Sequence, residues 1–292
     1  MIEEALALVL GRVRPLPEEQ VPVVEASGRW LARDAASRID LPPFASSAMD
    51  GFAVRAADTP GTLAIVGHSA AGRPARETVG EGEAIEISTG AVVPEGATAV
   101  VPVERTTLED GRVTVEGVAE GENIRPRGGD ARAGDVVVAA GTRLGPPQLA
   151  ALAAAGVATV ACARRPRVAV LATGSELRAP GEPLEAGQIY ESNSVLVAAQ
   201  AAQAGAIATV LPSAADDEAA TRAALAAGLA GDVLVTSGGV SVGEHDLVRA
   251  GLVELGAQEV FWRVAVKPGK PVAFSVRNGT LVFGLPGNPV SS

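Results

Sequence analysis

The sequence predicts a multidomain protein, in which an α/β domain with a parallel sheet accompanies a β-rich module and a small helical linking domain. Three observations predict this fold class. The length of 292 residues exceeds one ordinary domain. Short β-type runs between turn residues fill the middle of the chain, and strands alternate with helices after it. We place the linking domain at residues 1–45 with 141–165, the β-rich module at 46–140 and the α/β domain at 166–292.

The linking domain is predicted from three short segments. Apolar residues spaced for one helix face predict a helix over residues 1–10, ending near Gly11. Residues 21–24 have the composition of a short strand. Pro146 and Pro147 suit the first turn of a helix that runs to Ala155.

The β-rich module is predicted from apolar runs separated by Gly, Pro and acidic turn residues. Its expected strands are 52–55, 63–67, 84–88, 97–103, 112–115 and 135–139. The α/β domain is predicted from apolar strands that alternate with helices, a pattern typical of a parallel sheet covered on both faces. Its expected strands are 168–171, 207–211, 233–236, 259–264, 272–275 and 281–283, with helices near 193–204, 217–229 and 246–255. Residues 288–292 look like the start of a helix, so we expect a chain truncated at its C-terminus.

Composition excludes several classes of protein. No apolar run approaches the ~18 residues of a transmembrane helix, and the acidic start, Met1-Ile2-Glu3-Glu4, is unlike a signal peptide. The single cysteine, Cys162, excludes a disulfide framework and a Cys-based zinc site. A net charge of −10 without a basic run argues against nucleic acids and membrane surfaces as partners. We therefore expect a cytoplasmic protein.

Three glycine-containing loops follow predicted strands of the α/β domain, at 172–176, 237–243 and 284–289. In open α/β sheets, ligands bind outside the carboxyl ends of the strands, and glycine lets backbone N–H groups approach an anion. None of the loops matches the usual dinucleotide or P-loop patterns. They predict a site for a phosphate-bearing ligand, although each glycine could simply serve a turn.

The lysines support an anion site. Only two of the 24 basic residues are lysines, and both lie in Lys267-Pro268-Gly269-Lys270. Pro followed by Gly is typical of a type II turn, whose end residues lie within about 7 Å of each other. An ammonium group is a compact point charge, unlike a planar guanidinium. We therefore expect both lysines to reach one anion, the alternative being a solvated turn.

Acidic residues near these loops predict a bridging cation. Mg²⁺ binds through one or two carboxylates together with phosphate oxygens and water. Glu176 and Asp246 flank the loops, and Asp216 precedes a predicted helix. Asp216 and Asp246 also suit a helix N-cap, so capping alone would explain them. Outside the α/β domain, segment 41–52 carries a methionine, two aromatic residues and an Asp-Gly turn, and segment 123–130 carries two arginines and an aspartate in a tight loop. Both could equally be packed hairpins with a surface turn. Chemistry alone predicts only an anionic ligand held by a multidomain protein.

The motifs together resemble the molybdopterin molybdenumtransferase family, whose relatives include the E domain of gephyrin. The resemblance rests on residues 46–55, 88–91, 123–130, 173–177, 237–246, 267–271 and 284–289. It implies an elongated protein whose α/β domain binds molybdopterin. It further implies a Mg²⁺-dependent transferase that inserts molybdate into adenylylated molybdopterin, releasing AMP and yielding molybdenum cofactor. A homodimer is implied too, with a cleft between the α/β domain of one subunit and the β module of the other, and possible contact with the molybdopterin adenylyltransferase.

The resemblance also implies roles for single residues. The expected catalytic residues are Asp50, Asp130, Glu176, Asp246, Lys267 and Lys270. The expected cofactor-binding residues are Thr89, Thr173, Gly174, Ser237, Gly238, Gly239, Ser241, Pro286, Gly287 and Pro289. The expected Mg²⁺ ligands are Glu176, Asp216 and Asp246.

Some positions depart from the family pattern. The family commonly has Tyr at the position of Phe52, Glu at that of Gly129 and Asp at that of Glu191. We also expect the family's C-terminal β domain to be missing from this chain. Two other functions stay open. One is a nucleotide or molybdopterin pyrophosphohydrolase or adenylyltransferase-like enzyme, which AMP release without molybdate would favour. The other is a non-enzymatic scaffold.

Overall fold

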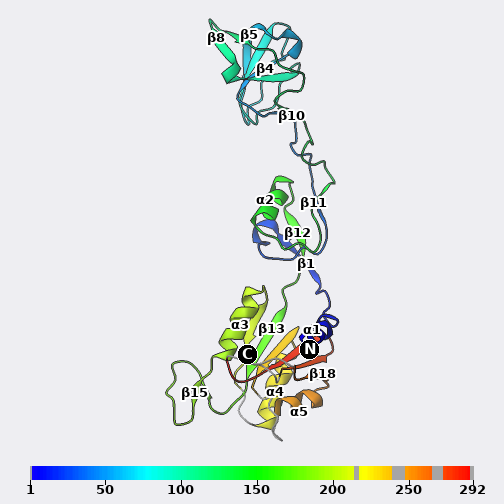
Figure 1. The fold of residues 1–292 in the computed structure, drawn as a ribbon, viewed down its shortest axis with the longest axis vertical. Coiled ribbons are helices and arrows are strands. Elements are labelled where there is room, and N and C mark those ends of the chain that lie inside the picture. Colours follow the sequence, from blue (N-terminus) through cyan, green and yellow to red (C-terminus); the bar gives the residue numbers. More distant parts are fainter. Residues whose placement is uncertain (1, 214–216, 239–246, 265–271, 290–292) are drawn as a thin grey trace. The chain divides into compact units, whose positions relative to one another are not determined.

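The computed structural model describes residues 2–213, 217–238, 247–264 and 272–289 (Figure 1). The chain divides into two compact units, Gln20–Cys162 and Met1–Glu19 with Ala163–Ser292, each of which is described by itself. None of the helices in these described ranges is long and apolar enough to cross a membrane.

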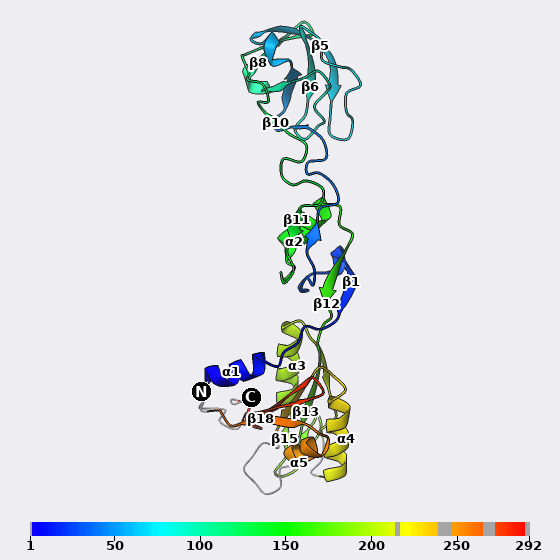
Figure 2. The ribbon, with the colours of Figure 1, turned by 90° about the vertical axis from the view of Figure 1, so that its right-hand side faces the viewer.

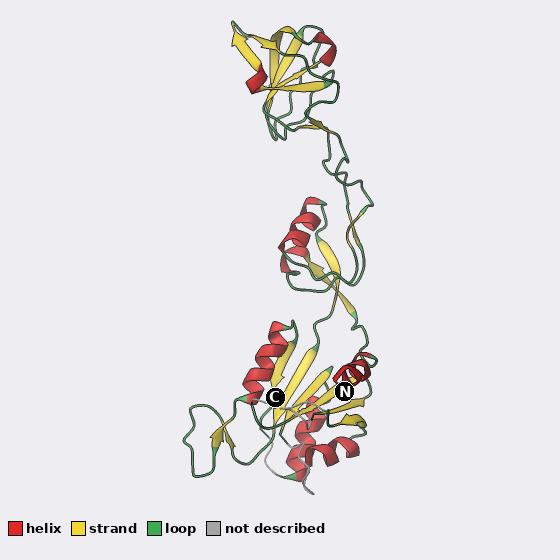
Figure 3. Cartoon of the chain, viewed as in Figure 1, coloured by secondary structure: helices red, strands yellow, loops and turns green. Residues whose placement is uncertain are grey.

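The unit Gln20–Cys162 contains a six-stranded sheet (Figure 3). Its order is β7-β4-β6-β5-β9-β8, and every pair is antiparallel except β5 with β6. Successive residues of β4 face opposite sides, so Phe52 and Val54 enter one core while Ala53 enters another. The strands are β4 (Gly51–Val54), β5 (Gly61–Ser69), β6 (Glu83–Ile87), β7 (Ala99–Pro102), β8 (Thr106–Glu109) and β9 (Arg112–Val115), with 3-10 turns η2 (Ala56–Asp58) and η3 (Val103–Arg105).

The predicted strands of this sheet are confirmed, but β8 was not predicted. It joins β9 through Asp110-Gly111, a dipeptide typical of tight hairpin turns. The predicted strand at 135–139 is confirmed as β11 (Val136–Val138), which pairs with β2 (Ala35–Ala36) and so lies outside the six-stranded sheet.

A separate core of the same unit gathers around α2 (Pro146–Ala154), which begins at the predicted proline pair. Leu31, Leu144, Leu152 and Val160 are almost fully buried in it. The segments expected to be a helical linking domain are mixed in content, because small two-stranded sheets accompany α2. These pair β1 (Glu18–Pro22) with β12 (Thr159–Ala163) and β2 with β11, while β3 (Ser46–Ser47) pairs with β10 (Ile124–Arg125). The strand predicted at 21–24 ends at Pro22, and η1 (Val23–Glu25) is a 3-10 turn.

The other unit contains a second six-stranded sheet, of order β16-β13-β17-β20-β19-β18. The first four strands are parallel, as predicted. The last two are antiparallel, so a wholly parallel sheet was wrong. Asn278 and Gly279 join β19 to β20 with φ of 49° and 91°, the conformation of a two-residue hairpin. The strands are β13 (Arg167–Ala172), β16 (Ile207–Val210), β17 (Val233–Ser237), β18 (Gln258–Trp262), β19 (Ala273–Arg277) and β20 (Thr280–Leu285).

Helices cover both faces of this sheet, as predicted (Figure 2). Val168 and Val170 of β13 pack with α3 residues, whereas Ala169 and Leu171 face α4 and α5. The helices are α3 (Asn193–Gln203), α4 (Glu218–Gly228) and α5 (Leu247–Glu254), and α1 (Ile2–Leu10) also belongs to this unit. The N-cap of α4 is Asp217, whose side chain accepts the N–H of Ala220 at 2.8 Å.

Candidate functional site

A cavity of about 280 Å³ opens where the parallel strands β13, β17 and β20 end. This is the edge of the sheet at which α/β folds bind ligands. The loop after each of the three strands contributes to its lining, and so does the start of α3. The lining residues are Ala172, Thr173, Glu176, Leu177, Ile189, Tyr190, Glu191, Ser192, Asn193, Ser237, Gly238, Gly287 and Pro289.

Many of the predicted ligand-binding residues therefore meet at one place. Thr173, Glu176, Ser237, Gly238, Gly287 and Pro289 all line the cavity. Gly174 lies beside it, since a side chain there would meet the Glu176 carboxylate. Pro286 contributes its carbonyl, which accepts the Ser237 hydroxyl at 3.4 Å.

Backbone hydrogen bonds join the three loops. The N–H of Thr173 donates to the carbonyl of Ser237 at 3.0 Å, and the N–H of Gly238 donates to the carbonyl of Leu285 at 3.1 Å. The first bond links the loop after β13 to β17, and the second links the loop after β17 to β20. These two amides are thus used within the protein and do not face a ligand.

Gly238 is placed where any other residue would be strained. Its φ is +87°, and a Cβ there would lie 2.7 Å from the carbonyl oxygen of Thr173. L-residues disfavour this backbone conformation, and 2.7 Å is closer than real Cβ contacts allow. Glycine at 238 lets the loops after β13 and β17 pack against each other.

Asn193, the first residue of α3, holds two of the loops together and was not predicted as a site residue. The residue is buried, with only 7% of its surface exposed. Its Nδ2 donates to the hydroxyl of Ser237 at 2.7 Å and to the carbonyl of Gly287 at 2.8 Å. Because a carbonyl can only accept, the Gly287 contact fixes which way the amide faces. A signal was present in the sequence: an Asn opening a helix that starts at the ligand-binding edge.

Glu191 lines the cavity, but its carboxylate has a structural task. One oxygen accepts the N–H of Ser194 at 2.8 Å, and the other accepts the Ser194 hydroxyl. Both residues are buried. The carboxylate thereby satisfies donors at the start of α3 and keeps Asn193 in place.

Glu176 is the predicted metal ligand that the structure describes. It is exposed, and its carboxylate lies over Gly174, where a Cβ would clash with Oε2. Within the described ranges no group of three or more His, Cys, Asp or Glu side chains could hold a metal. Asp216 and Asp246 lie outside those ranges, as do Gly239, Ser241, Lys267 and Lys270.

Three predicted residues lie in the unit Gln20–Cys162. The structure brings two of them together, because the N–H of Thr89 donates to Oδ1 of Asp50 at 2.7 Å. Asp130 pairs with Arg125, and its own N–H donates to the carbonyl of Leu41 at 2.8 Å. All three are exposed, so their side chains are open to a ligand.

An ion pair supports the turn that carries Asp130. The guanidinium of Arg127 donates to Asp40 at 2.7 Å, and the N–H of Ala133 donates to the same carboxylate at 3.0 Å. The Ala133 N–H and then Arg127 lower the pKa of Asp40 below its usual value. Segment 123–130 is therefore a turn held by defined contacts.

Two family models together match most of the chain. The model described as MoeA N-terminal region (domain I and II) matches residues 1–156, and the one described as probable molybdopterin binding domain matches residues 169–292. Relatives with similar sequences belong to the same family. The chain is 43% identical to a molybdopterin molybdenumtransferase of Haemophilus influenzae, over 95% of this chain and 70% of the relative. It is 39% identical to molybdopterin molybdenumtransferase 2 of Mycobacterium tuberculosis, over 100% of this chain and 75% of the relative.

Solved structures are similar over nearly the whole chain. A molybdopterin biosynthesis MoeA protein from Pyrococcus horikoshii matches with a TM-score of 0.85 and 36% identity, covering 99% of this chain and 75% of that one. A molybdopterin biosynthesis MoeA protein from Pyrococcus horikoshii OT3 matches with a TM-score of 0.84 and 33% identity, covering 99% of this chain and 74% of that one. The mixed α/β architecture described above is thus shared with these proteins.

Proposed function

Because the chain belongs to the MoeA family of molybdopterin molybdenumtransferases, we propose that it inserts molybdate into adenylylated molybdopterin, releasing AMP and yielding molybdenum cofactor. The observation that carries this proposal is the cavity of about 280 Å³ at the carboxyl ends of β13, β17 and β20. Its lining combines hydroxyl, amide and carboxylate groups with the apolar side chains of Leu177 and Ile189. A heterocyclic ligand with phosphate groups needs both kinds of surface.

The chain's own residues contribute positioning and charge. Asn193, Ser237 and Gly287 keep the loops at a fixed spacing, which orients the bound molybdopterin. Lys267 and Lys270 hold molybdate and phosphate oxygens as point charges. When AMP leaves, negative charge develops on its phosphate oxygens, and nearby ammonium groups stabilise it. No covalent nucleophile is required for this reaction.

Mg²⁺ is the metal we propose for this site, and Glu176 supports the proposal. Its exposed carboxylate at the cavity fits a cation that takes one or two carboxylates plus phosphate oxygens. Asp216 and Asp246 would complete the ligands. When bound, the ion would polarise the phosphoanhydride. We do not assign Glu191 to the metal, because it is buried and both of its oxygens already accept hydrogen bonds from Ser194 that hold the start of α3.

We further propose a cytoplasmic homodimer with a shared cleft, in which Asp50, Thr89 and Asp130 of one subunit complete the site of the other. The domain boundaries 1–45 with 141–165, 46–140 and 166–292, and contact with the adenylyltransferase, stay predictions. Mixing two inactive variants tests the shared cleft. Asp50→Ala and Lys270→Ala subunits should regain activity on subunit exchange, because one of the two sites then has neither substitution. No recovery, with dimers formed, would contradict a shared cleft.

The proposed reaction is tested by supplying adenylylated molybdopterin with and without molybdate and measuring AMP. We expect AMP release to require both molybdate and Mg²⁺, and to stop when a chelator removes the metal. Release without molybdate would instead indicate a pyrophosphohydrolase. Binding of molybdopterin without any AMP release would favour a scaffold.

A further inference from the structure

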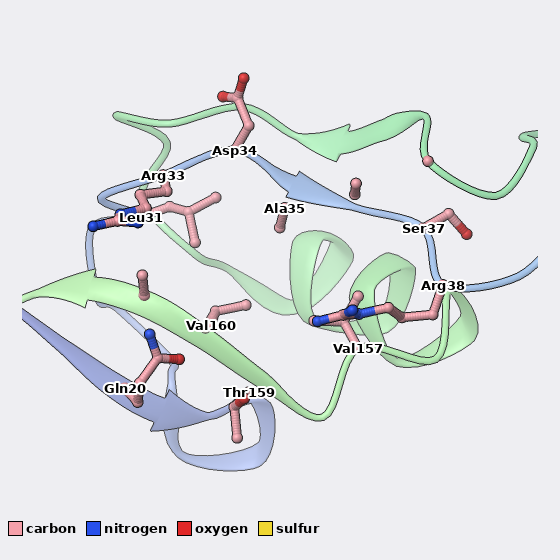
Figure 4. A pocket seen from close by; sticks show the side chains of 13 residues that line it. Gln20, Leu31, Arg33, Asp34, Ala35, Ser37, Arg38, Val157, Thr159 and Val160 are labelled. Carbon is pink, nitrogen blue, oxygen red and sulfur yellow. The ribbon is translucent and has the colours of Figure 1, made fainter.

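A second cavity, of about 430 Å³, lies within the unit Gln20–Cys162 (Figure 4). None of the residues that the family resemblance singles out lines it. Its walls come from β1, from β2 and the residues around it, and from the start of β12. Its volume falls in the range of small-molecule sites, roughly 300–1,000 Å³.

The cavity lies between two chain segments, residues 32–38 and 155–161, which are hydrogen-bonded to each other at their ends. The N–H of Ala32 donates to the carbonyl of Ala161, and the N–H of Arg38 donates to the carbonyl of Ala155, each at 2.8 Å. Between these points, β2 pairs with β11 and β12 pairs with β1. The two strands are therefore held apart by their own partners, and the space between them is part of the fold.

The floor of this cavity is apolar and closely packed. Leu31, Ala35, Val157 and Val160 line it and belong to the packed core around α2. They are 2 to 8% exposed. A ligand would therefore lie against a surface that does not need to rearrange, which lowers the entropic cost of binding.

Some polar side chains around the cavity already form hydrogen bonds within the protein, and others do not. The Asp34 carboxylate accepts the N–H of Ala140 at 2.7 Å, and the Ser37 hydroxyl donates to the carbonyl of Ile39 at 2.6 Å. In Figure 4 both side chains point away from the floor. The Arg38 side chain instead extends along the floor to Val157, and the Gln20 amide faces the same space. Neither of these two side chains has a hydrogen bond or ion pair within the described parts of the chain.

We propose that this cavity binds a small organic anion, in which a carboxylate or phosphate group is joined to a flat or aliphatic body. The guanidinium of Arg38 would hold the anionic group through paired N–H donors. The apolar body would cover Leu31, Val157 and Val160, and Gln20 would hydrogen-bond its far end. Inorganic phosphate alone would leave the apolar floor uncovered, and a neutral ligand would gain nothing from the exposed charge of Arg38. The site is independent of the proposed transferase reaction.

Phenyl phosphate is a suitable probe, because it combines the two required parts. Titrated into the isotope-labelled full chain, it should shift the backbone amide resonances of residues 31–38 and 157–161. We expect inorganic phosphate and benzyl alcohol, which each supply one part, to bind at least tenfold more weakly. Arg38→Gln should weaken phenyl phosphate binding about tenfold or more, as expected for one lost hydrogen bond to a charged group, with little effect on benzyl alcohol.

Arg73→Gln is the matched control. Arg73 is an exposed arginine of the same unit, and its loss changes the net charge equally without touching the cavity. Its affinity for phenyl phosphate should equal that of the unsubstituted chain, and both variants should keep their melting temperature and transferase activity. Equal weakening by both substitutions would overturn the proposal, and so would shifts confined to residues 172–176. If phenyl phosphate does not bind and Arg38→Gln abolishes self-association of the protein, a second copy of the chain covers the cavity. That result would also overturn the proposal.

Discussion

Gly238→Ala tests whether the close approach of two loops is required at the candidate site. The substitution adds one methyl group at a position where φ is +87°. That methyl carbon would lie 2.7 Å from the carbonyl oxygen of Thr173 and 3.1 Å from its Oγ1. Thr173 cannot easily retreat, because its N–H is bonded to the carbonyl of Ser237 at 3.0 Å. The loops after β13 and β17 must therefore separate.

Two terms set the expected loss of stability. Left-handed backbone at a residue other than glycine costs about 1–2 kcal/mol. Forcing a methyl group into occupied space costs roughly a further 1–3 kcal/mol. Gly205 supplies a control for the first term alone. Its φ is +97°, and a Cβ there would meet nothing within 4 Å. Gly205→Ala should thus lower the free energy of unfolding by about 1–2 kcal/mol, and Gly238→Ala by about 2–5 kcal/mol.

Urea denaturation of both variants measures the stability difference, and AMP release measures the effect on the site. We expect Gly238→Ala to lower kcat/KM at least tenfold, because the displaced loop no longer orients the ligand. Gly205→Ala should stay within about twofold of the unsubstituted chain, since additions on open surface disturb little. Equal stability of the two variants would refute the close-approach argument. Full activity in a destabilised Gly238→Ala would show that the loop spacing does not matter for the reaction.

Four further substitutions test other residues. Asn193→Asp turns the donor that faces the Gly287 carbonyl into an acceptor. The KM for adenylylated molybdopterin should therefore rise about tenfold, which corresponds to a loss of about 1.4 kcal/mol. Gln203→Glu is the control, because it makes the same change at an exposed position of α3, and it should leave KM unaltered. Arg164 donates to Asp232 at 2.7 and 2.8 Å and lowers the pKa of that carboxyl. Because the pKa of Asp232 is lower in the folded than in the unfolded state, the ionised carboxylate stabilises the fold. Asp232→Asn should therefore lower the free energy of unfolding by about 1–3 kcal/mol at pH 7. In urea titrations the difference between the two proteins should shrink once the pH falls below about 4, the pKa of an unperturbed Asp, and disappear when the folded carboxyl is protonated too. Lys267→Arg and Lys270→Arg keep the charge but replace a point charge by a planar group, so molybdate insertion should fall while molybdopterin binding persists; equal AMP release would contradict the role given to the lysines.

The sequence predicted most strands and helices because their apolar periods are clear. Strands β13, β17 and β20 each carry an apolar run between turn residues, and α3, α4 and α5 follow helical spacing. Strand direction was harder to predict, because an apolar strand looks alike in a parallel and in an antiparallel pair. The deciding information lay in the Asn278-Gly279 turn, which leaves no room for a crossover helix and requires β19 to run against β20.

The candidate site could be predicted from its loops but not from its internal contacts. Thr173, Ser237 and Gly287 follow strand ends, and parallel strands bring such ends to one edge. Asn193 joins that edge from a helix N-terminus, and only the crossing of α3 over the sheet brings its amide to Ser237 and Gly287. A contact between residues 44 positions apart has no local signature in the sequence.

The structure also changes the explanation for the glycine loops. Their backbone N–H groups were expected to receive an anion, but the amides of Thr173 and Gly238 already donate to Ser237 and Leu285. Glycine at 238 therefore serves the packing of one loop on another. These two amides are therefore not free to bind an anion, and in a chain with a net charge of −10 cationic side chains would supply the attraction that an anionic ligand needs. Only two lysines occur in the sequence, and both lie in one tetrapeptide. If the function proposed above holds, the loops set the shape of the site and the two lysines its positive charge. A substitution that alters loop spacing should then act mainly on molybdopterin orientation, and one that alters the lysines mainly on molybdate.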